Sequence, residues 1–206
     1  MRKKERKVIV AKKAAKLLYN NLVRDYKQAK EEACRDLGVK VFPTNFDIAI
    51  ELDKLADEVE SISRRDLNIR LRKEALQFMN YLKDFSPRLI GGVWRGTAKK
   101  GSDIDITVYS NDIEAVLRVI KERYEVSKAE YSYKTVKGKS EKYFHIYIFL
   151  PSGDELEVVI RDLLEINKRR RCEIYRDYIT GLTINQLQKV LRNDPTRKFI
   201  PKARAL

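Results

Sequence analysis

The first third of the chain has apolar residues at every third or fourth position, a spacing typical of helices that bury one face. One such stripe covers residues 11–37 and predicts a single long helix that ends at Gly38. After a short connector, stripes over residues 48–62 and 66–85 predict two further helices, and Pro87 ends the pattern.

Apolar and polar residues alternate from Arg88 onward, which is the period of β-strands. The alternation predicts strands over residues 88–93, 103–109, 125–136, 142–150 and 155–160. An amphipathic helix is predicted after the second of these strands, over residues 111–124. Two C-terminal helices are predicted over residues 162–179 and 183–194, with Thr183 as the N-cap of the second.

These elements predict an α+β fold in which a mixed sheet lies between helical flanks. They divide the chain into a helical N-terminal region (residues 1–87), a core that holds the sheet (residues 88–165) and a basic helical C-terminal region (residues 166–206). With 206 residues, 43% of them hydrophobic, the chain is long enough for one sizeable core with a helical appendage.

The formal net charge is +14, and the positive excess lies on both flanks. Residues 1–87 carry 20 Lys or Arg against 14 Asp or Glu, residues 88–160 carry 12 against 11, and residues 161–206 carry 12 against 5. This distribution suits a polyanionic partner such as a nucleic acid. A thermophile surface dense in charged residues, which make up 36% of the chain, explains the same numbers and is compatible with such a partner.

The sequence also bears on the compartment. No apolar run reaches transmembrane length, and no apolar segment of signal-peptide type follows the basic N-terminus. Cys34 and Cys172 lie far apart without metal-type spacing, so we interpret them as buried thiols in a reducing compartment. A cytoplasmic protein is therefore expected.

Two aspartates stand one residue apart in the strand over residues 103–109. Asp103 and Asp105 point to the same face, and carboxylates this close repel each other unless a cation lies between them. The preceding Gly91 and Gly92 would let the backbone approach a ligand, and the residues after them would start a helix whose N–H groups face a phosphate. Such a set of groups suits a hard divalent cation such as Mg²⁺, which is held by a few carboxylates plus phosphate oxygens.

A third carboxylate is expected on the strand over residues 155–160, because a catalytic two-metal site usually needs one. Glu157 lies between Leu156 and Val158 and so faces away from these apolar neighbours. Glu155 shares the face of Glu157 and is the alternative, whereas Asp154 lies in the preceding turn and is a weaker candidate.

The segment LIGGVWRGTAKKGSDIDI resembles the signature of the DNA polymerase β-type nucleotidyltransferase superfamily. The matching residues are Ile90, Gly91, Gly92, Arg95, Gly96, Ser102, Asp103, Asp105 and Ile106. The segment ELEVVI is similar to the strand that bears the third acid in tRNA CCA-adding and poly(A) polymerases, which places that acid at Glu157. In two departures from the family pattern, Trp94 replaces a residue that is usually small, and the third acid is Glu instead of the commoner Asp.

The resemblance implies transfer of a nucleoside monophosphate from an NTP, with ATP or CTP expected, to a hydroxyl group, and Mg²⁺ or Mn²⁺ as cofactor. It implies that Asp103 and Asp105 hold both metal ions and that Glu157 helps to bind the ion that polarises the acceptor hydroxyl. The triphosphate contacts that it implies are made by Gly91, Gly92 and Ser102, with Arg95 or Lys99 neutralising the charge.

Other residues allow more than one interpretation. The basic cluster Lys168, Arg169, Arg170 and Arg171 would either bind the phosphate backbone of an acceptor or form a solvated helix face. Trp94 would stack on a base or anchor the packing. His145, the only histidine, is assigned a structural or exposed role, because metal sites that use histidine need further histidines nearby.

Three functions remain open at the level of sequence. An enzyme acting on RNA or tRNA is favoured by the carboxylates together with the basic flanks. A stand-alone nucleotidyltransferase that places AMP on a protein, or modifies a small molecule such as an antibiotic, is favoured by the short C-terminal part. A non-catalytic RNA- or nucleotide-binding module is disfavoured, because a site without catalytic activity would not need neighbouring charges that destabilise the fold. The oligomeric state stays open.

Overall fold

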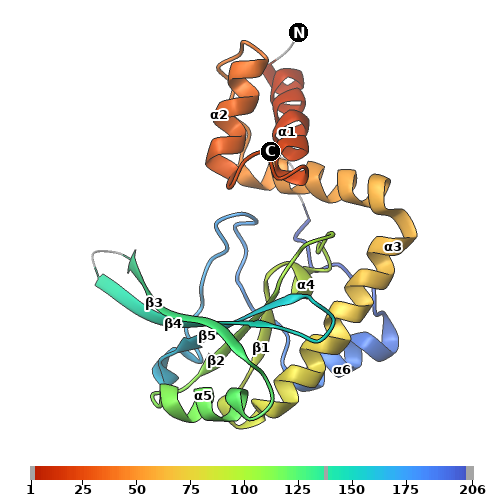
Figure 1. The fold of residues 1–206 in the computed structure, drawn as a ribbon. Coiled ribbons are helices and arrows are strands. Elements are labelled where there is room, and N and C mark those ends of the chain that lie inside the picture. The colour runs from red at the N-terminus through yellow and green to blue at the C-terminus, as the bar shows by residue number, and fades with distance from the viewer. Residues whose placement is uncertain (1–2, 137–138, 203–206) are drawn as a thin grey trace. The chain divides into compact units, whose positions relative to one another are not determined.

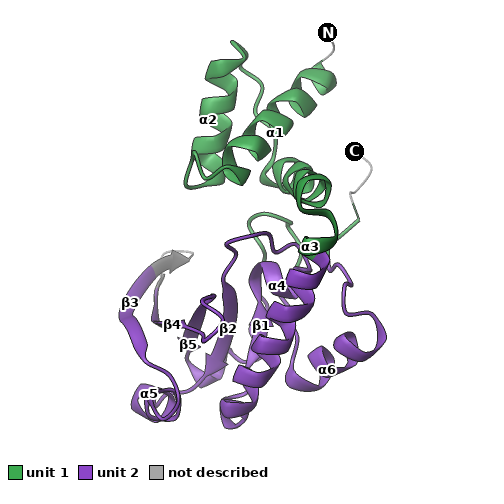
Figure 2. Cartoon of the chain, turned by 45° about the vertical axis from the view of Figure 1, so that its right-hand side comes forward, with its two compact units in different colours: residues 1–64, 171–178, 200–206 green, residues 65–170, 179–199 purple. Residues whose placement is uncertain are grey.

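A computed structural model describes residues 3–136 and 139–202 of the chain (Figure 1). The chain divides into two compact units, which Figure 2 colours separately. The first, here called the helical unit, comprises residues 1–64, 171–178 and 200–206, and the second, the sheet unit, comprises residues 65–170 and 179–199. No helix in the described ranges is both long and apolar enough to cross a membrane.

The helical unit contains α1 (Lys3–Tyr19), α2 (Tyr26–Asp36) and the first part of α3 (Asn45–Tyr81). Small side chains fill much of its core, where α1 and α2 pack against each other. Because alanine adds little bulk, helices lined by it can approach closely. The fully or almost fully buried residues of this core are Val10, Ala11, Ala14, Ala15, Ala29, Ala33 and Ile48.

The single long helix expected over residues 11–37 is wrong, because the chain leaves helical geometry between α1 and α2. Asn21 adopts a left-handed conformation with φ of 54°, and Asp25 caps α2 by accepting a hydrogen bond from the backbone N–H of Gln28. Leu22, which continues the apolar stripe in sequence, is 67% exposed. The stripe therefore spans two packed helices joined by a turn.

The two helices expected over residues 48–62 and 66–85 are confirmed as the two parts of α3. The parts meet at Ser61, whose φ of 48° and ψ of −123° are non-helical. The second part ends at Tyr81, and the short 3₁₀ helix η1 (Lys83–Phe85) follows it before the first strand.

The sheet unit holds one five-stranded mixed sheet with strand order β1-β2-β5-β4-β3. Its strands are β1 (Arg88–Ile90), β2 (Ile104–Tyr109), β3 (Val126–Val136), β4 (Lys139–Phe149) and β5 (Glu155–Arg161). The pair β2 and β5 is parallel, and the other neighbouring pairs are antiparallel. This mixed sheet with flanking helices confirms the expected α+β class.

Three further helices belong to the sheet unit: α4 (Gly91–Arg95), α5 (Ile113–Lys121) and α6 (Ile184–Asn193). Asp112 caps α5, and Thr183 caps α6 in a reciprocal capping box with Gln186. The core lies on the sheet face that carries Ile104, Ile106 and Val108 of β2 together with Leu156, Val158 and Ile160 of β5. The opposite face of these two strands carries their polar residues.

The helix expected over residues 162–179 is wrong. Only the 3₁₀ helix η2 (Leu163–Glu165) forms there, and residues 171–178 make a short hairpin instead. In this hairpin Arg171 bridges Tyr178, and the backbone N–H of Cys172 donates to the carbonyl of Asp177. Backbone pairing across this hairpin thus replaces the hydrogen bonds of a helix.

Candidate active site

Three carboxylates converge on the polar face of the sheet unit. Asp105 on β2 and Glu157 on β5 are direct partners in the parallel register, and Asp103 precedes β2 on the same side of the chain. One ligand oxygen from each of these three side chains lies within 4.8 Å of the other two. The two aspartates and the glutamate that sequence spacing singled out are therefore brought together.

The carboxylates are held in an environment that opposes negative charge. Burial, the charges of Asp103 and Glu157, and a hydrogen bond with Glu157 raise the pKa of Asp105 well above its usual range. Burial also raises the pKa of Asp103, and the charge of Glu157 adds to this effect. A divalent cation would remove this repulsion, so the three residues fit a metal ion with hard oxygen ligands.

Gly91 lies directly against the carboxylate of Asp105. It follows Ile90, the antiparallel register partner of Asp105, and has a φ of 68°. A Cβ placed on Gly91 would lie 1.7 Å from Oδ2 of Asp105. The position therefore requires glycine for both its backbone conformation and the space that the carboxylate occupies.

The glycine pair starts α4, whereas the sequence predicted a helix starting after it. A Cβ on Gly92 would meet only ordinary contacts, at 3.7 Å from Ala98 Cα, so the steric demand lies on Gly91. The C-terminal end of α4 is anchored by Arg72, a fully buried side chain that donates to the carbonyls of Val93 and Trp94. Burial lowers the pKa of Arg72 to about 10.

The structure separates the two candidates for the third acid. Glu157 joins the aspartates, whereas Glu155 is exposed and pairs in register with Phe149 at the start of the strand. Asp154 lies in the turn and forms an ion pair with Arg70. The geometry therefore favours Glu157.

A residue that the sequence did not place at the site is His145. Its Nδ1 lies 2.6 Å from Oε1 of Glu157, and its Nε2 lies 2.5 Å from Oγ of Ser132. Burial and the charge and hydrogen bonding of Glu157 raise the pKa of the neighbouring Tyr147 to about 12. The side chains of β4 alternate, so His145 and Tyr147 face the same side as Glu157. The sequence pattern could not place His145 there, because it does not show that β4 lies beside β5.

The other residues expected to bind the nucleotide lie in the loop around α4. Ser102 Oγ accepts a hydrogen bond from the backbone N–H of Lys99, whose side chain is half-buried. Arg95 is 4% exposed, donates to the carbonyl of Phe199 and lies over the ring of Trp94, which is itself 4% exposed. These contacts favour a packing role for Trp94.

The basic cluster does not form a helix face. Lys168 pairs with Glu141 and Glu165, and Arg170 pairs with the same two carboxylates. Hydrogen bonds from Lys168 and Tyr143 lower the pKa of Glu141 to about 2. Arg171, at the start of the hairpin, lies over the ring of Tyr178 instead.

The sheet unit thus places three carboxylates together on β2, the residue before it and β5, with Gly91 packed against Asp105. The family model of the nucleotidyltransferase domain matches residues 69–179, and the chain belongs to this family within the polymerase β-type superfamily. A comparison with curated proteins found no match.

Proposed function

We propose that the protein transfers a nucleoside monophosphate from an NTP to a hydroxyl group of RNA. The observation that carries the proposal is the convergence of the three carboxylates Asp103, Asp105 and Glu157 within 4.8 Å, in a chain of the nucleotidyltransferase domain family. A site that keeps such mutually repelling charges at a cost in stability is suited to hold cations.

In the proposed reaction, the acceptor oxygen forms a bond to the α-phosphorus. The bond from that phosphorus to the bridging oxygen of the β-phosphate breaks, pyrophosphate leaves, and the hydroxyl proton is released to solvent. Asp103, Asp105 and Glu157 would hold Mg²⁺ or Mn²⁺, which supplies charge neutralisation and lowers the pKa of the acceptor hydroxyl. The contact of His145 with Glu157 keeps the third carboxylate turned toward the aspartates.

The triphosphate would lie along the α4 loop. Gly91 and Gly92 expose backbone there, and Ser102 places a hydroxyl at the entrance to β2. Arg95 or Lys99 would neutralise phosphate charge, and the Arg95 guanidinium also contacts the Phe199 carbonyl and the Trp94 ring. ATP or CTP is the proposed substrate.

An RNA acceptor is supported by the formal net charge of +14. Electrostatic attraction to a phosphate backbone accounts for most sequence-independent binding to nucleic acids. Transfer to a protein or to a small molecule uses the same chemistry and is the alternative that the experiment separates.

The test is incorporation of each α-labelled NTP in the presence of Mg²⁺ or Mn²⁺, with total cellular RNA in one reaction and protein alone in another. The proposal expects label in RNA and its loss in the Asp103→Asn variant. Label in the protein fraction, or transfer only to added small hydroxyl compounds, would replace RNA as the acceptor. No metal-dependent transfer from any NTP to any of these acceptors would overturn the proposed activity itself.

A further inference from the structure

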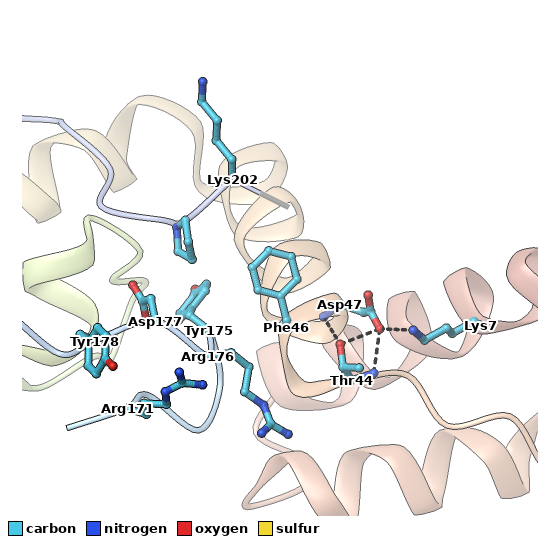
Figure 3. Close-up of a pocket in the computed structure, with 11 residues that line it drawn as sticks. Lys7, Thr44, Phe46, Asp47, Arg171, Tyr175, Arg176, Asp177, Tyr178 and Lys202 are labelled. Carbon is cyan, nitrogen blue, oxygen red and sulfur yellow. Dashed lines mark hydrogen bonds and ion pairs between the residues drawn. The ribbon is translucent and has the colours of Figure 1, made fainter. Parts of the chain in front are cut away.

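The helical unit carries two neighbouring cavities that share Lys7, Phe46 and Asp47. The first, of about 580 Å³, is formed by the start of α3, the hairpin of residues 171–178 and the segment around Lys202 (Figure 3). The second, of about 950 Å³, is formed by α1, the connector before α3 and the start of α3. All of these segments belong to one compact unit.

The two cavities are lined mainly by positive charge. Their cations are Lys3, Lys4, Lys7, Lys40, Arg171, Arg176 and Lys202. Their carboxylates are Asp47, Glu51 and Asp177. Lys7 and Thr44 already engage Asp47, with the Lys7 Nζ at 2.9 Å, and Lys54 engages Glu51 at 2.8 Å. The lining therefore has an excess of cations.

Most of these cations are available to an anion. In the described part of the chain, no ion pair is formed by Lys3, Lys4, Lys40, Arg176 or Lys202. Arg171 and Arg176 are exposed and extend from the hairpin on the same side of the cavity in Figure 3. Their guanidinium groups are suited to bidentate contact with phosphate.

Aromatic rings stand between the cations. Tyr175 is 9% exposed and packs edge-on against Phe46, with ring centroids 6.0 Å apart, so it fixes the hairpin on α3. Tyr178 and Phe42 are 43% and 57% exposed. Arg171 lies 5.6 Å from the centre of the Tyr178 ring. Exposed rings beside cations are the combination that binds single-stranded nucleic acid, since bases stack on rings while cations follow the backbone.

We propose that these two cavities form a docking surface for single-stranded RNA, separate from the carboxylate site of the sheet unit. The inference rests on the proposed RNA acceptor and names where that acceptor is held. A phosphate backbone matches the excess of cations, and exposed Tyr178 and Phe42 offer stacking surfaces that an acidic peptide would not use.

The experiment measures binding of a labelled single-stranded RNA to the full chain by fluorescence anisotropy, without NTP, across a series of salt concentrations. The variants are Arg171→Ala with Arg176→Ala, and Lys4→Ala with Lys40→Ala. The matched control is Lys12→Ala with Lys16→Ala, two exposed lysines of α1 that line neither cavity. Each cavity pair should weaken binding at least tenfold and reduce the magnitude of the salt slope by about 1.4, because a single-strand phosphate contact contributes about 0.7.

A second variant, Tyr178→Ala, separates stacking from charge. It should weaken binding about tenfold and leave the salt slope unchanged. Unchanged affinity in all cavity variants, an equal loss in the control pair, or equally tight binding of a poly-glutamate peptide would each overturn the proposal. Circular dichroism and thermal melting confirm that each variant is folded.

Failure of this inference can be told from failure of the proposed function. If the wild-type protein labels RNA while the cavity variants bind and label it normally, the docking surface is wrong and the activity stands. If RNA binds through the cavity residues while no NTP labels it, the activity on RNA is wrong and the docking surface stands.

Discussion

Replacing His145 by alanine should weaken metal binding while leaving the fold intact. The substitution removes two contacts, at 2.6 Å to Glu157 and at 2.5 Å to Ser132, from a side chain that is 18% exposed. A hydrogen bond to a charged group contributes about 1.5–3 kcal/mol. Without it, Glu157 gains rotamers that point away from Asp105.

Loss of a residue that orients a metal ligand typically lowers metal affinity by about 10- to 100-fold. We therefore expect the half-saturating Mg²⁺ concentration for nucleotide transfer in His145→Ala to rise within that range. The KM for NTP at saturating metal should change little, because His145 acts through Glu157 and not on the triphosphate. Direct titration of Mn²⁺ by electron paramagnetic resonance gives the same comparison without turnover.

Two controls sharpen this test. His145→Gln keeps a side-chain amide that can still hydrogen-bond Glu157 and should lie between the wild type and His145→Ala. Ser132→Ala removes only the outer contact and should have the smaller effect. If His145→Ala binds Mn²⁺ as tightly as the wild type while Asp105→Asn does not bind it, His145 has no role in positioning the third carboxylate.

The remaining predictions concern the carboxylate site and its support. Gly91→Ala should reduce transfer and metal affinity by about 100-fold or more, because the methyl group collides with Asp105 at a backbone conformation that favours glycine; near-normal Mn²⁺ binding would contradict this. In the metal-free protein, the contribution of Asp105 to stability should fall as the pH rises above about 3.8, the ordinary pKa of an aspartate, because its raised pKa makes the folded state retain a proton that the unfolded state releases. Asp105→Asn should therefore raise the melting temperature of the metal-free protein, flatten this pH dependence and abolish the stabilisation by Mg²⁺. Arg72→Met should destabilise the fold by about 3 kcal/mol or more in chemical denaturation, because it removes the donor from buried and partly buried carbonyls; the control Arg70→Met, which removes two ion pairs of a partly exposed side chain, should cost less than about 1 kcal/mol.

Local sequence features were sufficient to predict much of the secondary structure of the sheet unit. Alternation of apolar and polar residues placed Asp103 and Asp105 on one face and Ile104 and Ile106 on the other, which the packed sheet confirms. The capping signal at Thr183 located the start of α6. These features follow from side-chain geometry over a few residues, so a single sequence is enough to recognise them.

The positions at which the predicted helices are interrupted or replaced by other structure could not be recognised in this way. The apolar stripe through residues 11–37 continues across a turn, because the spacing in the turn imitates a helical period while Leu22 points to solvent. Residues 162–179 have a composition that permits helix, but pairing between Arg171 and Tyr178 and packing of Tyr175 on Phe46 determine a hairpin. Tertiary contacts overrode local preference in both places.

By itself the sequence determined the residue types of the site and the glycine that contacts Asp105. It also indicated the class of chemistry for which three carboxylates and a glycine pair are suited. Only the tertiary structure decided that β5 lies between β2 and β4, which puts Glu157 beside Asp105 on one side and His145 on the other. Strand order and register arise from packing between segments that are distant along the chain, and no local spacing encodes them. The cationic cavities of the helical unit have the same origin, because they join α1, α3 and a hairpin from the opposite end of the chain.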